Sequence, residues 1–490
     1  MNWLLNLSFL GSFWLLLEWF IRIASIYFVP KNRKPSSAMA WLLLIFFFPE
    51  FGIILFLILG NPKLPKSRRN AQKTLNKIIS STVHELKSKQ KDKKLLSADV
   101  GTKYLQVSKL ALALSHLPVF GGNSIKVLSE YNDIFNSIVE DLDKAKNFIY
   151  LEYFILVLDD STAPIFDALK RAVDRGVKVR VMYDSFSTKK FKSYKKMTER
   201  LKNDGVVAQE ILPLRFPGRG YVRPDLRNHR KLIVVDGVTG YTGSQNIVQR
   251  NYHRRDNIYY DEVVARICGP AVLQLSAIFL TDWFSETGNL LDYNSANIMN
   301  TELQSYGDTK IQILPSGPGY EDENNLKLFT SLIYSATKKI VLVNPYFVPD
   351  VSFLHAITSA AKRGVEVILI NSEAIDQWMV AHAQRSFYED LLRAGVKIFN
   401  YRAPVLLHSK FIIIDDELVT VGSSNLDIRS FELDLELTLI CYDPKAVKEF
   451  VHISKIYLEK SNQIHLESWT KKSRRSVFLN NIARLTSSLQ

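Results

Sequence analysis

Two long apolar segments stand near the start of the chain. Leu4 to Tyr27 contains only a few small polar residues and one charged pair, Glu18 and Arg22, and Ala38 to Leu59 carries a single charge. Either run is long enough to cross the hydrocarbon core of a bilayer, which takes about 20 helical residues. Glu18 and Arg22 lie four residues apart, on one helical face, where their charges offset each other. The pattern predicts a membrane hairpin over residues 1–60, with spans at about 4–27 and 38–59.

A cleaved signal peptide fits this pattern poorly, because no Lys or Arg precedes the first run and a second apolar run follows closely. Buried core helices are the other alternative, and the lengths favour the membrane. The short connection carries Lys31, Arg33 and Lys34, and a larger basic cluster follows the second run. By the positive-inside rule the larger cluster stays inside, which places the remaining chain on the cytoplasmic face, although the three loop charges oppose this orientation.

Residues 61–119 form the next region, and from about Lys66 to Lys103 it is rich in lysine and favours helix. We expect a basic juxtamembrane linker here. It acts either as a solvated spacer or as an electrostatic attachment to anionic lipid headgroups.

Beyond the linker the pattern becomes α/β, and it repeats. The strand-like segment Phe148 to Ile155 is matched by Ile340 to Val348. Two helix-to-strand turns follow each strand, with glycine at the position where a helix end needs positive φ: Gly176 and Gly205, then Gly364 and Gly395. The repeat is as long as a domain, so we expect two similar α/β domains at about 120–295 and 305–465, and a basic amphipathic tail at 466–490.

Composition and charge narrow the class of protein. With 490 residues, 47% hydrophobic and 23% charged, the chain is neither disordered nor collagen-like. The formal net charge is +14, and nine of these charges fall within residues 61–103. An excess so local, placed after apolar segments, favours contact with anionic lipid over a nucleic-acid-binding face. Cys268 and Cys441 lie in apolar, strand-like runs, so neither a disulfide framework nor a thiolate zinc site is expected.

One polar motif occurs twice, once in each half. The copies are His229-x-Lys231-x4-Asp236 with Gly243-Ser244-x-Asn246, and His408-x-Lys410-x4-Asp415 with Gly422-Ser423-x-Asn425. The offsets from His to Lys, Asp and Asn are two, seven and seventeen residues in both copies. One copy alone could be a satisfied strand histidine beside a solvated lysine. Six motif positions repeated in one register indicate a catalytic role.

The spacing also suggests what each motif residue does. Side chains two apart project from one face of a strand, so each His and Lys pair points the same way. The aspartates lie on the opposite parity and are more plausible as structural anchors. Glycine allows close backbone approach, and the following Ser and Asn offer neutral hydrogen bonds to a phosphate oxygen.

The duplicated motif resembles the signature of the phospholipase D superfamily, and the two apolar segments ahead of it resemble the bacterial cardiolipin synthases. The resemblance covers essentially the whole chain. It implies that two pseudo-symmetric α/β sandwich domains face each other across a pseudo-twofold axis and build one active site. Glu262 and Glu436 match the acidic positions that this family uses to orient its histidines, and the alternative for each is a charge at a strand edge.

Two histidines and two lysines supply the groups that phosphodiester exchange requires: a nucleophile, a proton donor and positive charge for phosphate oxygens. No cofactor or metal is expected, and no cluster of Asp, Glu and His has metal-ligand spacing. By resemblance, one histidine forms a phosphatidyl-histidine intermediate and the other serves the leaving and entering hydroxyls. We assign His229 as nucleophile and His408 as acid and base, although the two copies are nearly interchangeable on sequence.

The expected reaction transfers a phosphatidyl group from one phosphatidylglycerol to another, giving cardiolipin and glycerol. Basic residues around the first motif suit an anionic headgroup: Arg215, Arg219, Arg223, Arg227, Arg230, His253, Arg254 and Arg255. A hydrolase of the same superfamily, acting on phospholipid or less plausibly on nucleic acid, is the second hypothesis, and a non-catalytic lipid scaffold is the third. The sequence leaves acyl-chain preference, alternative donors, protein partners and homo-oligomerisation open, and the tail packs against either lipid or the domain.

Overall fold

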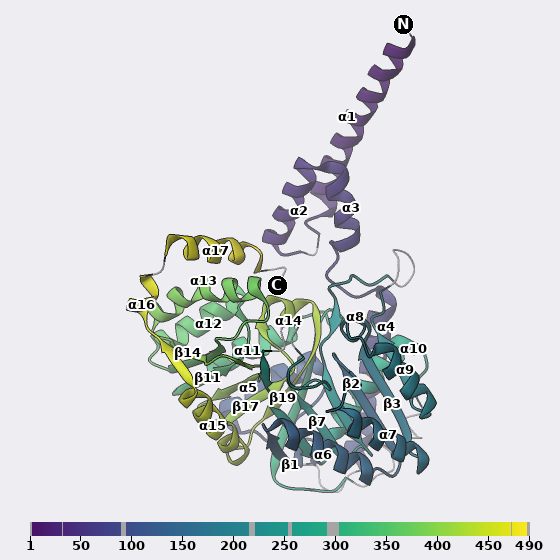
Figure 1. Ribbon diagram of the computed structural model, residues 1–490, viewed down its shortest axis with the longest axis vertical. Helices are drawn as coiled ribbons and strands as arrows, with labels where there is room; N and C mark the ends of the chain where they lie inside the picture. The colour runs from purple at the N-terminus through teal and green to yellow at the C-terminus, as the bar shows by residue number, and fades with distance from the viewer. Residues whose placement is uncertain are drawn as a thin grey trace. The chain divides into compact units, whose positions relative to one another are not determined.

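A computed structural model describes residues 2–31, 33–89, 95–214, 221–252, 257–291, 303–471 and 473–487. The chain divides into two compact units, one made of Met1–Lys63 and Leu214–Asp225 and the other of Leu64–Pro213 and Leu226–Gln490 (Figure 1). Each unit is described by itself below. The first is helical, and the second is an α/β unit that carries both copies of the motif.

The first unit contains α1 (Asn2–Phe28), α2 (Pro35–Phe47) and α3 (Pro49–Leu59). Within α1, Gly11–Phe28 is long and apolar enough to cross a membrane, as the first apolar run predicted. The second run differs from the single span expected over 38–59, because the helix breaks at Phe48. Pro49 disfavours helical geometry in the residue before it and donates no backbone hydrogen bond, so it ends α2 and begins α3.

The second unit is organised around one 16-stranded sheet. Its first half contributes β1 (Phe120–Leu128), β2 (Phe148–Tyr153), β3 (Lys178–Asp184), β4 (Val207–Ile211), β6 (Lys231–Val235), β7 (Thr239–Gly243) and β9 (Val264–Cys268). The second half contributes β10 (Thr309–Ser316), β11 (Lys339–Val343), β13 (Glu366–Ser372), β14 (Lys397–Tyr401), β16 (Phe411–Ile414), β17 (Leu418–Gly422), β19 (Asp434–Cys441) and β20 (Ser461–Ile464). The sixteenth strand is β5 (Arg227–Asn228), which pairs with β19. Two separate two-stranded sheets are formed by β8 (Tyr259–Asp261) with β15 (Val405–Leu407) and by β12 (Phe347–Val348) with β18 (Leu426–Asp427).

The order of strands is the same in both directions from the antiparallel pair β1 and β10. On one side follow β9, β7, β6, β2, β3 and β4, and on the other β19, β17, β16, β11, β13 and β14, with β20 added at that edge. In each half the last three strands are mutually parallel and the others antiparallel. The repeat recognised in the sequence therefore appears as one strand order used twice, within a single compact unit.

Helices cover both faces of this sheet. They are α6 (Tyr131–Lys144), α7 (Ala163–Asp174), α8 (Ser185–Thr188), α9 (Tyr194–Asn203) and α10 (Val272–Thr287), then α11 (Asn324–Ser335), α12 (Val351–Lys362), α13 (Trp378–Ala394), α14 (Ile428–Glu432) and α15 (Pro444–Glu459). Successive side chains of a strand point to opposite faces. Thus Ile149 and Leu151 of β2 join α6 and α7 in one core, while Tyr150 stacks on Phe279 of α10 at 4.5 Å. The same alternation places Ile412 in the core with α11 to α13, and Phe411 against α15.

The region expected to be a linker is instead packed onto the second unit. In α4 (Lys66–Lys89), Leu75 and Ile79 are buried, and Arg68 forms a two-pronged ion pair with Glu286 of α10. In α5 (Gly101–Ser115), Tyr104 and Val107 belong to the core of the second half. These helices are not a solvated spacer, because their apolar side chains are buried against the second unit.

The C-terminal tail forms α16 (Leu466–Thr470) and α17 (Arg474–Leu485), and α17 packs on α13. Asn480 hydrogen-bonds His382 of α13 at 2.8 Å. Of the two placements that the sequence left open, the structure has the tail against the domain. Phe478 and Leu485 of the same helix remain 62% and 84% exposed, so part of its apolar surface stays uncovered.

Candidate active site

Two short parallel strand pairs connect each motif histidine to the opposite half of the second unit. His229 follows β5, which pairs with the start of β19, and its backbone N–H donates to Leu435 at 2.9 Å. His408 follows β15, which pairs with β8, and its N–H donates to Asp261 at 2.8 Å. In both cases the residue that follows this carbonyl in the partner segment is a glutamate, and the pairing places the histidine beside it.

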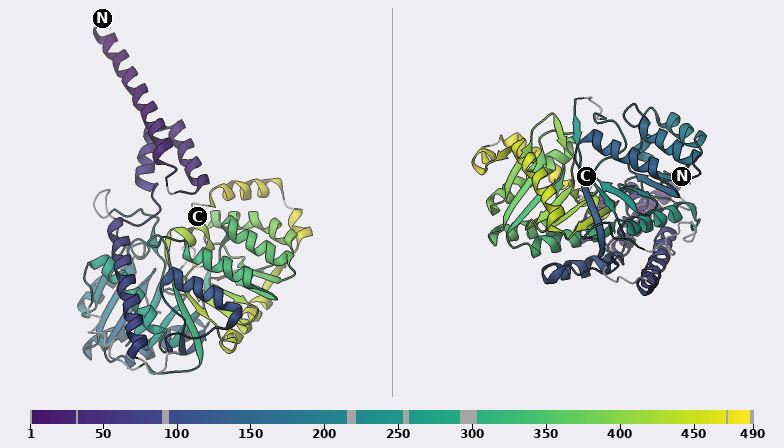
Figure 2. Two further views of the ribbon diagram at one scale, coloured as in Figure 1. Left: turned by 180° about the vertical axis from the view of Figure 1, so that it is seen from behind. Right: turned by 90° about the horizontal axis from the view of Figure 1, so that it is seen from below.

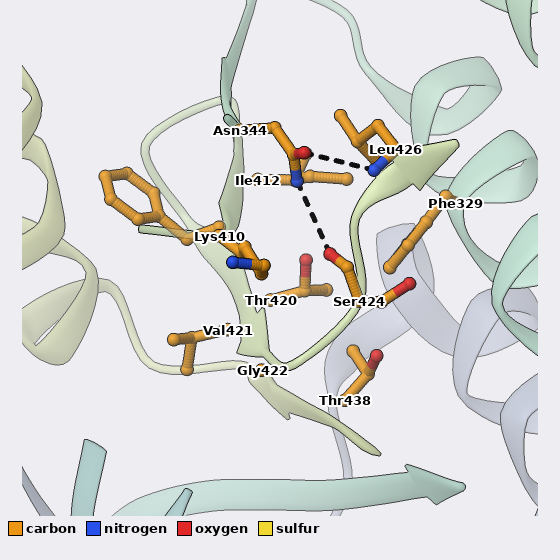
Figure 3. A pocket seen from close by; sticks show the side chains of 11 residues that line it. Phe329, Asn344, Lys410, Ile412, Thr420, Val421, Gly422, Ser424, Leu426 and Thr438 are labelled. Atoms are coloured by element: carbon orange, nitrogen blue, oxygen red, sulfur yellow. Dashed lines mark hydrogen bonds between the residues drawn. The ribbon is translucent and has the colours of Figure 1, made fainter. Parts of the chain in front are cut away.

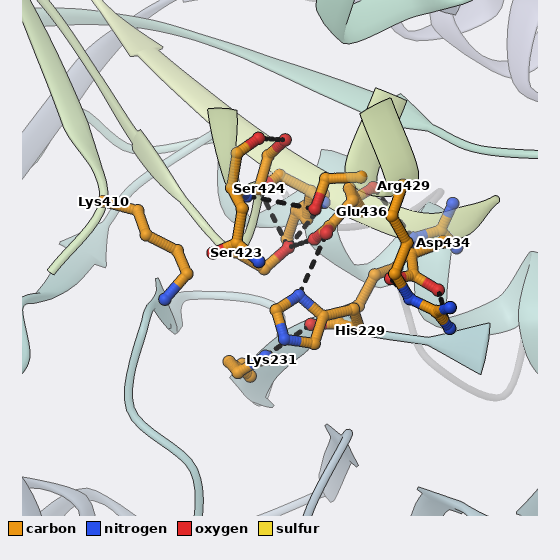
Figure 4. A network of polar contacts seen from close by, with 12 residues as sticks. His229, Lys231, Lys410, Ser423, Ser424, Arg429, Asp434 and Glu436 are labelled. Atoms are coloured by element: carbon orange, nitrogen blue, oxygen red, sulfur yellow. Dashed lines mark hydrogen bonds and ion pairs between the residues drawn. The ribbon is translucent and has the colours of Figure 1, made fainter. Parts of the chain in front are cut away.

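Each histidine is therefore paired with a glutamate from the other half, and Figure 4 shows this contact for His229 and Glu436. The Nδ1 atom of His229 lies 2.9 Å from Glu436, and Nδ1 of His408 lies 2.8 Å from Glu262. Although burial acts to raise their pKa values, the facing histidine and lysine charges hold the pKa of both glutamates below its usual value. An ionised carboxylate only accepts hydrogen bonds, so Nδ1 carries the proton and Nε2 of each imidazole keeps a lone pair.

Burial keeps both imidazoles neutral. His229 is 8% exposed and His408 is 5% exposed. Removal from water lowers the pKa of His229 to about 4, against the opposing charge of Glu436, and burial also lowers the pKa of His408. At neutral pH each ring therefore presents an unprotonated Nε2, which is the form required of a nucleophile or a general base.

The two motif lysines are almost completely buried beside the histidines. Their Nζ atoms donate to the backbone carbonyl of the histidine two residues earlier, at 2.6 Å for Lys231 and 2.7 Å for Lys410. Burial lowers the pKa of Lys231 to about 7 and that of Lys410 to about 8, and the charge of Lys410 further lowers the pKa of Lys231. The charges of Glu436 and Glu262 act in the opposite direction and favour the charged form of both lysines.

The two motif aspartates face away from the histidines. Asp236 accepts backbone hydrogen bonds of 2.7 to 2.9 Å from residues 146–148, at the start of β2. Asp415 accepts equivalent bonds of 2.7 to 2.9 Å from residues 337–339, at the start of β11. Both therefore tie the end of a motif strand to its neighbour in the sheet, and they anchor structure while making no contact with the imidazoles.

The glycine and serine after each motif strand help to position the glutamates. A Cβ at Gly243 would lie 2.3 Å from the carbonyl oxygen of Val263, and one at Gly422 would lie 2.1 Å from that of Leu437, so only glycine fits. The adjacent Ser423 donates to Glu436, and a hydrogen bond from Ser244 lowers the pKa of Glu262. Both hydroxyls thus contact the carboxylates, and their expected role in orienting phosphate remains a prediction.

The two motif asparagines have different surroundings. Asn246 accepts a backbone hydrogen bond of 3.3 Å from Ile155. The Oδ1 atom of Asn425 is buried and has no hydrogen-bond partner among the described residues. Their expected role in orienting phosphate remains a prediction.

A small cavity lined by both apolar and polar side chains adjoins Lys410 in the second half (Figure 3). Asn344, at the end of β11, spans it: its amide donates to Ser424 at 3.4 Å and its oxygen accepts from Leu426 at 3.2 Å. These bonds hold the loop that carries Ser423 and Asn425 beside the second lysine.

The residue between His and Lys differs in the two copies. Arg230 is 1% exposed, forms an ion pair with Asp282 of α10 and donates from Nε to the Glu436 carbonyl at 3.1 Å. The matching Ser409 shares a 2.9 Å hydrogen bond with Tyr457 of α15. The first motif is therefore backed by a buried ion pair and the second by two hydroxyls.

The aromatic surroundings of the two histidines differ as well. Phe154 packs edge-on to His229 with ring centroids 4.7 Å apart. Tyr260 and Tyr346 stand edge-on to His408 at 5.5 and 6.4 Å, and their hydroxyls donate to Oδ2 of Asp376 at 3.5 and 2.6 Å. Oδ1 of Asp376 is buried without a partner among the described residues. Sequence reasoning missed Asp376, which lies outside both motif copies and in no repeated segment.

Three of the basic residues expected to contact a headgroup are described, and each is paired with a carboxylate. Arg223 pairs with Asp225 in the first unit, and Arg227 is buried beside Asp184 in the second. Arg230 is buried as described above, and Lys231 alone of this stretch is grouped with the histidines. The remaining residues of the prediction lie outside the described residues: Arg215, Arg219, His253, Arg254 and Arg255.

Comparison with known proteins agrees with this architecture. Residues 138–283 and 329–455 match the family described as "Cardiolipin synthase, PLD-like domain", and residues 14–61 match "Phospholipase_D-nuclease N-terminal". The chain is 33% identical over 471 residues to cardiolipin synthase A of Wigglesworthia glossinidia brevipalpis, covering 94% of this chain and 92% of that one. It is 32% identical to cardiolipin synthase A of Yersinia pseudotuberculosis, covering 94% and 93%.

Among solved structures, the chain resembles phosphatidylserine synthase of Haemophilus influenzae Rd KW20. The TM-score is 0.59 at 15% identity, and the match covers 79% of this chain and all of that one. At this identity the likeness concerns the fold.

Proposed function

The chain belongs to the cardiolipin synthase family of the phospholipase D superfamily, and on this basis we propose that it is a membrane-bound phosphatidyltransferase that makes cardiolipin. It takes the phosphatidyl group of one phosphatidylglycerol and attaches it to a hydroxyl of a second, releasing glycerol. The observation that carries this proposal is the pair of crossed His–Glu contacts, His229 with Glu436 and His408 with Glu262. Because each contact joins the two halves, both motif copies serve one active site.

In the first step, Nε2 of His229 attacks phosphorus, so a P–N bond forms while the P–O bond to the leaving glycerol breaks. The low pKa of His229 supports this assignment, since its Nε2 is unprotonated at neutral pH. The incoming anionic phosphodiester favours the protonated form of His408, whose Nε2 proton passes to the departing glycerol oxygen. Lys231 and Lys410 offset the charge that builds up on the phosphoryl oxygens.

In the second step, a hydroxyl of another phosphatidylglycerol takes the place of the glycerol. Nε2 of His408 accepts its proton as the oxygen attacks phosphorus, and the P–N bond to His229 breaks. Glu436 and Glu262 are positioning residues: each holds one imidazole in the tautomer that leaves Nε2 available. Transfer is reversible because the leaving and entering groups are chemically alike.

The surroundings of His408 support placing glycerol on that side. The hydroxyls of Tyr260 and Tyr346 both donate to Oδ2 of Asp376, and Oδ1 has no hydrogen-bond partner among the described residues. A buried carboxylate oxygen without a hydrogen bond costs about 1–3 kcal/mol, and a glycerol hydroxyl is a donor that would satisfy it.

A product assay tests this function. Purified full-length protein in phosphatidylglycerol vesicles is expected to yield cardiolipin and an equal amount of glycerol by mass spectrometry, and His229→Ala and His408→Ala are expected to yield neither. Phosphatidic acid without cardiolipin would instead identify a hydrolase that uses water as acceptor. Product from either alanine variant at the wild-type rate would rule out a site built from both histidines.

A further inference from the structure

The second apolar segment folds back on itself within the first unit. A Cβ on Gly52 of α3 would lie 2.7 Å from the Cα of Ile45 in α2, and Arg33, just before α2, hydrogen-bonds the carbonyl of Gly60, just after α3. In one straight helix, residues 33 and 60 would be about 40 Å apart. Two views show α2 and α3 side by side next to α1 (Figures 1 and 2).

The two arms of this hairpin are too short to cross a bilayer. α2 has 13 residues and α3 has 11, whereas α1 has 27. At 1.5 Å per residue the arms measure about 20 and 16 Å, against a hydrocarbon core of about 30 Å. Of the three helices, α1 alone has the length of a span.

A hairpin that turns inside the bilayer needs partners for the backbone groups at its turn, because lipid offers none. α1 supplies one: Nε of Arg22 donates to the carbonyl of Phe46, in the last turn of α2, at 3.2 Å. The same guanidinium pairs with Glu18 at 2.9 Å. The charged pair inside the first apolar run therefore has a structural purpose, which is to cap the turn of the neighbouring hairpin.

The tip of the hairpin is apolar and unpacked. Phe47, Phe48 and Phe51 are 75%, 61% and 61% exposed. Three phenylalanines exposed at a single turn form a surface that water disfavours and acyl chains accept. The base of the hairpin is basic instead, with Lys31, Arg33 and Lys34 before α2.

We propose that α2 and α3 form a re-entrant hairpin that enters and leaves the bilayer on one face, and that α1 is the one crossing among the described helices. The N-terminus then lies on the opposite side of the membrane from the motif-bearing unit. A two-span hairpin would put the basic loop at residues 31–34 outside and the basic cluster after Lys63 inside. A re-entrant hairpin puts both on the same side.

This arrangement removes the conflict in the positive-inside rule that the sequence presented. Both basic clusters then face the cytoplasm, as the positive-inside rule favours. The motif-bearing unit therefore lies on the cytoplasmic face, where the hairpin inserts into the inner leaflet. The inference depends on the geometry of the first unit and is independent of the reaction assigned to the second.

Single-cysteine labelling in the full-length chain tests the proposal. Cys268 and Cys441 are replaced by alanine, and cysteine is placed in turn at Asn2, Lys31 and Lys63. Spheroplasts are treated with a membrane-impermeant maleimide before or after lysis. We expect Asn2→Cys to react in intact spheroplasts, and Lys31→Cys and Lys63→Cys to react only after lysis.

Reaction of Lys31→Cys in intact spheroplasts, with Asn2→Cys and Lys63→Cys protected, would establish two spans and overturn the proposal. Protection of all three would show that α1 does not cross, which also overturns it. Reaction of Lys31→Cys and Lys63→Cys together in intact spheroplasts would refute the cytoplasmic placement. Cardiolipin formation by each variant checks that the chain is folded, so failure of the proposed reaction stays distinguishable from failure of the topology.

A cross-link provides a second readout. The rings of Trp41 and Phe56 are 5.5 Å apart, so cysteines at these positions are expected to join through a short bismaleimide within one chain. Gly52→Leu, which cannot fit against Ile45, is expected to abolish this cross-link. Gly11→Leu is the matched control, because no atom lies within 4 Å of a Cβ at Gly11. Equal cross-linking in both variants would contradict the hairpin.

Discussion

The two halves of the motif-bearing unit carry the same six motif residues at the same spacing, yet they surround their histidines differently. Both use a glutamate held by a serine and a lysine bonded to a backbone carbonyl. Behind the first motif lies the buried pair Arg230 and Asp282, and beside the second lies a tyrosine group around Asp376. The repeated residues supply the same charges twice, and the unrepeated residues give the two histidines different surroundings.

The largest difference between the two halves is expected in the free energy of unfolding, when the residue between His and Lys is replaced. Arg230→Met leaves Asp282 buried without its partner and should lower the free energy of unfolding by about 3–5 kcal/mol. The matching change Ser409→Ala removes one hydroxyl contact and should cost about 1 kcal/mol. Denaturant unfolding of the full chain in detergent, followed by tryptophan fluorescence, measures both. The double variant Arg230→Met/Asp282→Leu should recover much of the loss, and equal losses for the two single variants would contradict the comparison.

The crossed glutamates should separate the two histidines kinetically. Glu436→Gln and Glu262→Gln should each slow cardiolipin formation about 100-fold, because a misplaced imidazole loses its alignment. With phosphatidyl-p-nitrophenol, whose leaving group needs no proton, Glu262→Gln should keep a rapid burst of p-nitrophenolate and Glu436→Gln should lose it. The opposite pattern would exchange the roles of His229 and His408.

Asp376→Asn should have a smaller and more selective effect. If Asp376 accepts a hydrogen bond from glycerol, this change should raise KM for phosphatidylglycerol about tenfold. It should leave the reaction of phosphatidyl-p-nitrophenol unchanged, since that substrate has no glycerol hydroxyls. Glu373→Gln, an exposed carboxylate in the same loop, serves as control. Equal effects on both substrates would argue that Asp376 is only structural.

The smallest effect is expected in the pH dependence of kcat/KM. The lowered pKa values of Lys231, about 7, and Lys410, about 8, mean that the empty site loses positive charge as pH rises through that range. The kcat/KM for anionic phosphatidylglycerol should therefore fall above about pH 7 to 8, roughly tenfold per unit at most. On the acid side, kcat/KM should rise as the pH falls below neutral, because His408, whose pKa is lowered by burial, must gain a proton to act as the acid. It should fall again near pH 4, where His229 gains a proton and loses its lone pair. A profile that keeps rising to pH 9 would contradict the assigned charges.

Much of this site could be read from sequence, because the offsets within one motif copy are fixed by strand geometry. The offsets placed His229 with Lys231 and set Asp236 on the other side. They could not predict that His229 pairs with Glu436, 207 residues away. That contact depends on β5, a strand of two residues, whose pairing with β19 has no periodicity to detect.

The other differences have equally local causes. Ser244 and Ser423 contact the glutamates, which the offsets could not predict, because close approach at Gly243 and Gly422 brings the facing strand within reach. The hydropathy of residues 38–59 indicated one span, and Phe48 and Pro49 divide it, since a single proline outweighs the pattern around it.

The central claim is that one shared site transfers the phosphatidyl group through His229. The most direct test is to mix His408→Ala with phosphatidyl-p-nitrophenol, quench within milliseconds under conditions that preserve phosphohistidine, and map the protein by mass spectrometry. The account predicts a phosphatidyl adduct on His229. In the matched His229→Ala protein it predicts no adduct on His408. An adduct on His408, or burst release of p-nitrophenolate with no adduct on either histidine, would contradict it.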